Sequence, residues 1–396
     1  MIDPYLLSVI IFFSFLAVLI YRDRKNIDFT YILMMRRTKR FRNILDRIAK
    51  KSPLFWKVIG TIAFFICLLF MVEGIRLLLI TDYLVFTGVI KEPGVSIAIP
   101  FPSEHMISGP GFIGVPFWFY IIIVASILIP HESFHGIVAR AEKVKLKSVG
   151  LFLFAILPGA FVEPDEKQFK KSKLMTKLRI LSVGSFINIV IGLTLMFLIQ
   201  NLLWAPNVNG LLITSVNETS PAGKLGLSSG MVLESIDGKD MNIGFYDYSF
   251  LVLMVPKSNT ENITKYISLV LLRSVLREYD PGDTVKLKIS GINYDLKLGE
   301  HPEVEGYPYI GITSQANTKN VNFFLVLFPL LSMISFFNIF VGIFNILPLY
   351  ITDGGQIVKA ITEKYAKKRS KQIEIIITSI ILFMILYAIV GPYIRF

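Results

Sequence analysis

The amino-acid sequence predicts a polytopic α-helical membrane protein that also carries a small α/β soluble domain. Of its 396 residues, 53% are hydrophobic and only 18% are charged. Six apolar segments are long enough to cross a bilayer as a helix, which takes about 20 residues. Lys and Arg residues cluster beside these segments, as they do in the cytoplasmic loops of membrane proteins.

The apolar segments define the expected spans. They lie at 5–21, 55–80, 112–138, 177–203, 321–347 and 372–394. A shorter apolar piece at 149–162 is interrupted by Pro158 and Gly159, so it is too short and too broken to be a further span.

The basic clusters determine the expected orientation. Twelve Lys or Arg stand against three Asp between Arg22 and Lys57, and a second cluster lies at 364–371. With the first cluster in the cytoplasm, counting crossings places each basic cluster that flanks a span on the inner side. We therefore expect a multi-pass protein of the cell membrane that contacts the lipid bilayer. The net charge of +12 is explained by these loops, and no nucleic-acid partner is expected.

Residues 205–320 have a different composition from the spans. Turn residues and alternating patterns such as "TVKLKIS" and "YDLKLGE" predict strands of a soluble domain on the outer side. The unusually apolar stretch 242–272 is expected to contact the membrane, to cover the site or to add to the core. The expected divisions are a membrane region with two spans and a basic loop (1–110), the first part of a membrane core (111–204), the soluble domain (205–305) and the second part of the core (306–396).

The segment "SILIPHESFHGIVAR", residues 126–140, places ionisable residues inside an apolar span. His131 and His135 are four residues apart and share one helix face, where both can ligate a divalent metal of zinc type. Glu132 lies about 100° around the helix, where it can take a proton from a water at the metal. The alternative is a pair of core histidines, but ionisable groups at membrane depth are usually functional.

The depth of this segment can be estimated from its distance to the next charge. His131 precedes Arg140 by nine residues, or about 13 Å along a helix. The site is therefore expected within the bilayer, toward the cytoplasmic face. Pro130 cannot donate a backbone hydrogen bond and is expected to open or kink the helix.

A third ligand is expected in "FNILPLYITDGGQ", residues 344–356. Asp353 follows the fifth span at its cytoplasmic end, so the crossing order brings it to the same membrane face as the histidines. The alternative is that Asp-Gly-Gly only forms a turn. Asn345 offers an amide donor for a substrate carbonyl, or else it packs between helices.

Three motifs taken together resemble the site-2 protease family of intramembrane zinc metalloproteases, in its archaeal form. They are "HESFHG", "VGSFINIVIG" and "NILPLYITDGG", in the order of that family. The resemblance implies that His131, His135 and Asp353 hold Zn²⁺, that Glu132 is the general base and that Asn345 positions the scissile peptide. It also implies hydrolysis of peptide bonds within or near the transmembrane helices of substrate membrane proteins.

Two further segments resemble parts of such enzymes. "GAFVEPDE" (159–166) resembles the re-entrant β-hairpin near the active site, which would bind an extended substrate through Phe161 and Val162. The segments 210–240 and 276–300 resemble a PDZ domain. This resemblance implies that an edge strand binds peptide C-termini or ectodomain segments. The residues expected there are Gly210, Leu211, Leu212 and Ile213.

Two rival functions come from other classes of protein. A membrane metal-ion transporter also places His and Asp within the bilayer, but it has no need for Glu132 beside the first histidine. A catalytically inactive, PDZ-bearing membrane scaffold would lack a ligand or the base, and all four residues are present.

Overall fold

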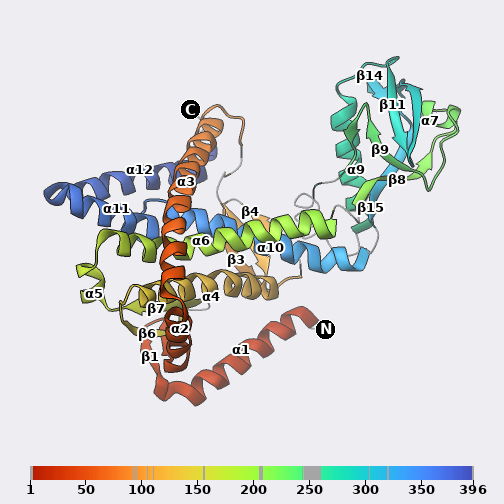
Figure 1. Cartoon of the computed structure of the whole chain (residues 1–396). Helices are drawn as coiled ribbons and strands as arrows, with labels where there is room; N and C mark the ends of the chain where they lie inside the picture. The colour runs from red at the N-terminus through yellow and green to blue at the C-terminus, as the bar shows by residue number, and fades with distance from the viewer. Residues whose placement is uncertain are drawn as a thin grey trace. The chain divides into compact units, whose positions relative to one another are not determined.

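The computed structural model describes residues 3–91, 93, 96–104, 106–109, 111–154, 157–204, 208–242, 244, 260–302, 304–318 and 321–394. It divides the chain into two compact units (Figure 1). Unit 1 comprises residues 1–194 and 334–396, and unit 2 comprises residues 195–333. Residues 245–259 lie outside the described residues. The expectation that the apolar stretch 242–272 contacts the membrane or covers the site falls largely on these residues.

Six helices of the described chain are long and apolar enough to cross a membrane, which confirms the expected number of spans. They are α1 (Pro4–Asp23), α3 (Pro53–Phe86), α4 (Phe117–Ala141), α6 (Leu174–Leu198), α10 (Val321–Ile346) and α12 (Ser370–Val390). Their outward-facing residues are large and apolar, as a lipid environment requires. The α4 helix runs on through Pro130 without a break.

A four-stranded antiparallel sheet lies beside α4 in unit 1. Its strands follow the order β1 (Ile27–Thr30), β2 (Leu33–Arg37), β6 (Leu146–Phe154) and β7 (Leu157–Pro164). The β6 and β7 strands form a hairpin, in which Val149 pairs with Val162 and Phe152 with Gly159. Among the described residues β7 pairs with a strand on one side only, so it forms an edge of this sheet.

The basic loop between the first two spans is part of this structure. Its strand β2 pairs with β6, from Leu33 opposite Phe154 to Arg37 opposite Gly150. Its amphipathic helix α2 (Lys39–Lys51) packs on α4, where Leu45 is buried against Gly136. Asp46 forms an ion pair with Arg140 at the end of α4. The loop therefore supports the helix that carries the candidate site.

The α6 and α10 helices approach each other closely at two glycines. A Cβ on Gly192 would lie 2.7 Å from the carbonyl oxygen of Ser335, and one on Gly342 would lie 3.0 Å from that of Ser185. Small residues allow such close packing between membrane helices. The remaining α-helices and strands of unit 1 are α5 (Glu166–Lys171), α11 (Asp353–Tyr365) and the small sheet of β3 (Ile97–Phe101), β4 (Ile107–Gly109) and β5 (Phe112–Pro116).

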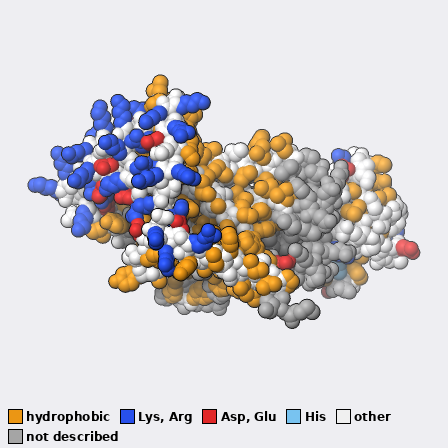
Figure 2. Space-filling view, turned by 90° about the horizontal axis from the view of Figure 1, so that it is seen from below, with side chains coloured by type: hydrophobic (Ala, Val, Ile, Leu, Met, Phe, Trp, Pro, Cys, Tyr) orange, Lys and Arg blue, Asp and Glu red, His pale blue; other side chains and the backbone are white. Residues whose placement is uncertain are grey.

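Lys and Arg side chains of unit 1 gather beside a surface of hydrophobic side chains (Figure 2). This distribution is the one expected for a membrane protein with basic loops on one side. At the C-terminal end of α4, Glu142 forms an ion pair with Arg179 of α6 at 2.7 Å. Arg179 also donates to Thr61 of α3 at 2.8 Å, so one polar network joins three spans at this end.

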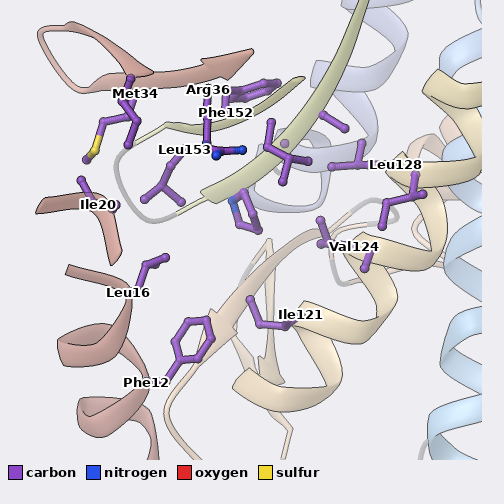
Figure 3. Close-up of a pocket in the computed structure, with 17 residues that line it drawn as sticks. Phe12, Leu16, Ile20, Met34, Arg36, Ile121, Val124, Leu128, Phe152 and Leu153 are labelled. Carbon is purple, nitrogen blue, oxygen red and sulfur yellow. The ribbon is translucent and has the colours of Figure 1, made fainter. Parts of the chain in front are cut away.

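An apolar cavity of about 360 Å³ lies between α1, α4 and the sheet (Figure 3). The α1 helix contributes Phe12, Leu16 and Ile20, and α4 faces it with Ile121, Val124 and Leu128. Residues 158–160 at the start of β7 and residues of β1, β2 and β6 also line the cavity. Arg36 is the only charged residue among the described residues that line this cavity.

Among its described residues, unit 2 contains a six-stranded sheet and two α-helices of its own, besides a π-helical segment (Ile199–Trp204) and the adjoining ends of α6 and α10. The strand order is β12 (Ile292–Lys297), β11 (Thr284–Ile289), β9 (Val232–Ile236), β8 (Val208–Val216) and β15 (Ile312–Thr318), with β10 (Lys239–Asp240) beside β9. The helices are α7 (Pro221–Lys224) and α9 (Thr260–Leu276), and a separate hairpin joins β13 (Gly299–His301) and β14 (Val304–Tyr309). Alternate residues of β11 are fully buried, as the sequence pattern predicts for a strand with one face on a core.

Candidate metal centre

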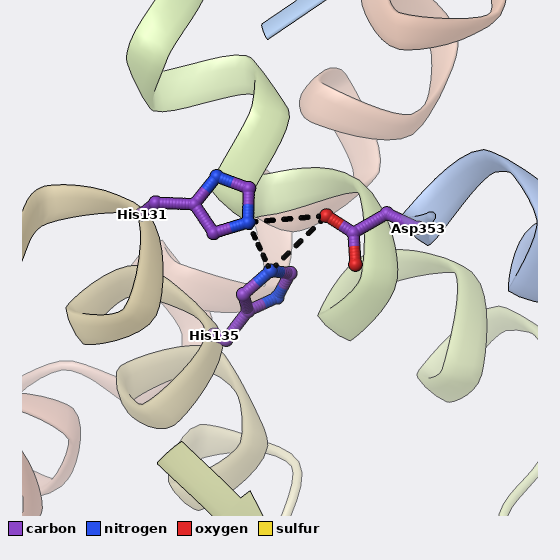
Figure 4. Close-up of side chains that lie close together, drawn as sticks. All are labelled: His131, His135 and Asp353. Atoms are coloured by element: carbon purple, nitrogen blue, oxygen red, sulfur yellow. Dashed lines mark hydrogen bonds and ion pairs between the residues drawn. The ribbon is translucent and has the colours of Figure 1, made fainter. Parts of the chain in front are cut away.

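Two histidines and one aspartate meet inside unit 1 (Figure 4). His131 and His135 project from one face of α4, and their Nε2 atoms are 3.1 Å apart. Asp353 Oδ2 lies 3.3 Å from each of these nitrogens. His131 is buried, and the other two side chains are largely shielded from solvent. The structure thus brings together the three residues that the sequence predicted as ligands.

The backbone around Asp353 explains why two glycines follow it. Thr352 caps α11, accepting a hydrogen bond from the Gly355 amide at 3.3 Å and donating to the carbonyl of Leu347 at 2.6 Å. A Cβ on Gly354 would lie 1.9 Å from the Ile346 carbonyl oxygen, and one on Gly355 would lie 1.7 Å from that of Leu349. Only glycine fits at these two positions, where α11 begins against the backbone of residues 346–349. This close packing directs Asp353 toward the histidines.

The three groups fit a zinc-type ion in chemistry and in spacing. Two imidazole nitrogens and one carboxylate oxygen are the donor set of catalytic zinc sites, which keep a fourth position open. With bonds of about 2.0–2.1 Å, tetrahedral ligand atoms lie roughly 3.3 Å apart. The observed separations of 3.1–3.3 Å match that spacing.

Glu132 lies on the same cavity as the three candidate ligands but is not one of them. Its Oε2 accepts a hydrogen bond from the backbone N–H of Val162 on β7, at 2.8 Å. The cavity has a volume of about 370 Å³. Lys147, Glu163 and Glu166 bring charge to its lining. A hydrogen bond from Lys170 lowers the pKa of Glu166.

The α6 helix supports the site with residues spaced four apart. The carbonyl oxygen of Ile180 lies 2.6 Å from His135 Nδ1, and the Asn188 amide lies 3.2 Å from His131 Nδ1. Between them, a Cβ on Gly184 would lie 2.3 Å from His135 Nε2. Sequence reasoning did not assign these roles, although Gly184 and Asn188 stand in the motif "VGSFINIVIG". Their spacing was the available signal, since residues 180, 184 and 188 share a helix face.

The remaining predicted site residues of unit 1 are Asn345, Phe161 and Val162. Asn345 is half-buried near the end of α10 and is not among the residues that line the metal cavity. On β7, Val162 lines this cavity, whereas Phe161 contacts the opposite strand at Gly150. The roles predicted for Asn345 and Phe161 therefore stay predictions.

Residues 210–213 were expected to form a free strand edge that binds peptides, and this expectation is wrong. These residues lie on β8, where Leu211 pairs with Leu233 of β9 and also with Ala316 of β15. Because β8 is hydrogen-bonded on both sides, an added peptide would have to displace β15. Gly210 has a different role: its φ of +67° and the 2.4 Å that would separate its Cβ from the Leu233 carbonyl oxygen require glycine.

The fold and site together define a class of protein, namely a polytopic helical membrane protein with a candidate metal site between its helices. The sequence model of peptidase family M50 matches residues 119–388, which include all four residues of the predicted site. The chain therefore belongs to peptidase family M50, the site-2 protease family. It is also 25% identical to an uncharacterised protein of Methanocaldococcus jannaschii over 360 residues, which cover 89% of this chain and 85% of that protein.

Proposed function

We propose that the protein is an intramembrane zinc endopeptidase that hydrolyses peptide bonds within or near the transmembrane helices of other membrane proteins. The observation that carries the proposal is the meeting of His131, His135 and Asp353 on a cavity that also contains Glu132. Membership of a peptidase family supports the same reaction class. A transporter would need the three ligands but not the carboxylate beside them.

The chain's own residues divide the chemistry between them. His131, His135 and Asp353 would hold the zinc ion, which supplies Lewis acidity and lowers the pKa of the attacking water. Glu132 takes the proton from that water and later delivers it to the leaving amine nitrogen. Its hydrogen bond from Val162 holds the carboxylate on the cavity, where this transfer takes place. Asn345 is proposed to donate to the scissile carbonyl, as the family resemblance implies.

The substrate is proposed to bind in an extended conformation along β7. A helical substrate must unwind first, because its carbonyl groups are already hydrogen-bonded and shielded. The outer edge of β7 can replace those hydrogen bonds by strand addition at positions other than Val162, whose N–H already donates to Glu132. Residues 158–160 of β7 border the apolar cavity beside α1, and Val162 borders the metal cavity, so one strand connects the two. An apolar segment lying against α1 would thus be led to the metal centre.

The test compares wild-type protein with Glu132→Gln in detergent, measuring bound zinc and cleavage of a model transmembrane peptide. We expect zinc to be retained and cleavage to fall by about 10²–10⁴-fold, the usual contribution of a general acid–base group. The matched control is Glu166→Gln, which neutralises a carboxylate on the rim of the same cavity that is paired with Lys170. This control should cleave normally.

Each rival function predicts a different result. A transporter would move zinc into proteoliposomes and cleave nothing in either form. An inactive scaffold would neither cleave nor transport. Equal cleavage by Glu132→Gln and wild type would show that Glu132 is not the base.

A further inference from the structure

The Nδ1 atoms of His131 and His135 face away from the candidate metal position, and their hydrogen-bond partners determine which ring nitrogen carries the proton. Both rings direct Nε2 toward Asp353 and toward each other, so Nε2 is the metal-facing atom. A neutral imidazole that offers the Nε2 lone pair to a metal carries its proton on Nδ1. Each Nδ1–H then needs a hydrogen-bond acceptor, and metal-ligating histidines nearly always have one.

For His135 the acceptor is in place. The carbonyl oxygen of Ile180 lies 2.6 Å from His135 Nδ1, and a carbonyl can only accept. This contact fixes the tautomer of His135 and the plane of its ring. The second histidine needs an equivalent partner.

For His131 the neighbouring atom is an amide nitrogen. Asn188 Nδ2 lies 3.2 Å from His131 Nδ1, which would place one donor against another. At the same time Asn188 Oδ1 is buried and has no hydrogen-bond partner among the described residues. Both anomalies concern a single amide group, whose oxygen and nitrogen ends have nearly the same shape. Turning the amide by half a rotation brings Oδ1 to the histidine and removes the contact between donors.

We infer that Asn188 is a positioning residue whose side-chain oxygen accepts the Nδ1–H of His131 and thereby holds this histidine in the metal-binding tautomer. The inference rests on the proposed metal centre. It makes α6 the element that prepares both histidines: Ile180 orients one through its backbone, and Asn188 orients the other through its side chain. Gly184, halfway between them, leaves room for both rings.

The test measures the affinity for Co²⁺ of the full-length protein in detergent, by competition with a chelator and by the visible absorption of the bound ion. Asn188→Leu keeps the volume but removes the acceptor, so we expect an affinity about 10–100-fold lower. Asn188→Asp keeps an oxygen facing the histidine, so it should bind Co²⁺ as well as wild type and show the same spectrum. Rescue by aspartate separates hydrogen-bond acceptance from packing.

Asn338→Leu provides a matched control in the same helix bundle. Asn338 is as fully buried as Asn188, but it donates to Ser126 and to the Ile334 carbonyl and contacts no ligand. Its replacement should lower thermal stability and leave Co²⁺ affinity unchanged.

Three results would overturn the inference. Equal binding by wild type and Asn188→Leu would show that the contact has no effect on the metal. An equal loss of affinity in Asn188→Asp and Asn188→Leu would show that the amide donates to the histidine. An equal loss in Asn338→Leu would show a general effect of polar burial. If wild-type protein took up no Co²⁺ at all, the proposed metal centre itself would be absent, a failure distinct from the first three.

Discussion

The three residues of the candidate metal centre could be predicted from the sequence because each carries a local signal. His131 and His135 have the four-residue spacing of a shared helix face, and Asp353 stands at the end of a span that returns to the same side. For Gly184 and Asn188 the only local signal was a helix face shared with residue 180, which does not by itself assign a role. Their roles depend on which face of α6 packs against α4, and an apolar span with polar residues on several sides does not reveal that face.

Gly184 offers a prediction at this scale. In Gly184→Ala the new Cβ would lie 2.3 Å from His135 Nε2 and 2.8 Å from His131 Nε2, so the rings must move out of the arrangement proposed to hold the metal. We expect Co²⁺ affinity to fall by about 10–100-fold, as for other disturbances around a ligand. Chelator competition measures this change.

The matched control is Gly74→Ala. Its Cβ would meet side chains only, with Ile343 Cγ2 at 2.8 Å, and none of them is a ligand. The control should cost stability without loss of metal. Normal Co²⁺ affinity in Gly184→Ala would contradict the account of α6 as the element that accommodates the rings.

The elements themselves were predictable only where their signal is local. Long apolar helices are visible in the sequence because lipid surrounds them on most sides. The pairing of β2 with β6 joins residues 33–37 to residues 150–154, and nothing in either segment names its partner. The expectation that β8 lies at an edge failed for the same reason. Its partner β15 is distant in the sequence, and nothing in β8 indicates this pairing. Strand order is a property of the whole sheet and not of one strand.

The α2 helix leads to a prediction at the scale of elements. Leu45 is 2% exposed and packs against Gly136, in the turn of α4 that follows His135. Leu45→Ala should destabilise the protein by about 2–5 kcal/mol, the usual cost of such a cavity. The neighbouring Ile44 is 49% exposed, so Ile44→Ala should change stability by no more than about 0.5 kcal/mol. Unfolding in detergent compares the two, and equal effects would show that α2 does not support α4.

At the scale of the whole molecule, the sequence predicted the six spans and a separate folded segment between the fourth and fifth. The spans follow from apolar length alone. The second unit follows from a change of composition, and its described strands form a sheet with its own core. What unit 2 binds could not be predicted, because a peptide-binding edge depends on the strand order of the complete sheet.

The orientation of the molecule in the membrane can be tested with single cysteines, because the chain's one native cysteine, Cys67, is fully buried. The positive-inside rule places the basic loop at Lys368 in the cytoplasm and unit 2 outside. In intact cells a membrane-impermeant maleimide should therefore label Ser228→Cys, at an exposed site of unit 2, and should not label Lys368→Cys. After lysis both should react, which shows that both sites are accessible. Asp353 and Lys368 follow the same span, α10, with no further span between them. Labelling of Lys368→Cys alone in intact cells would therefore place the metal centre toward the outer face and reverse the route by which a substrate reaches it.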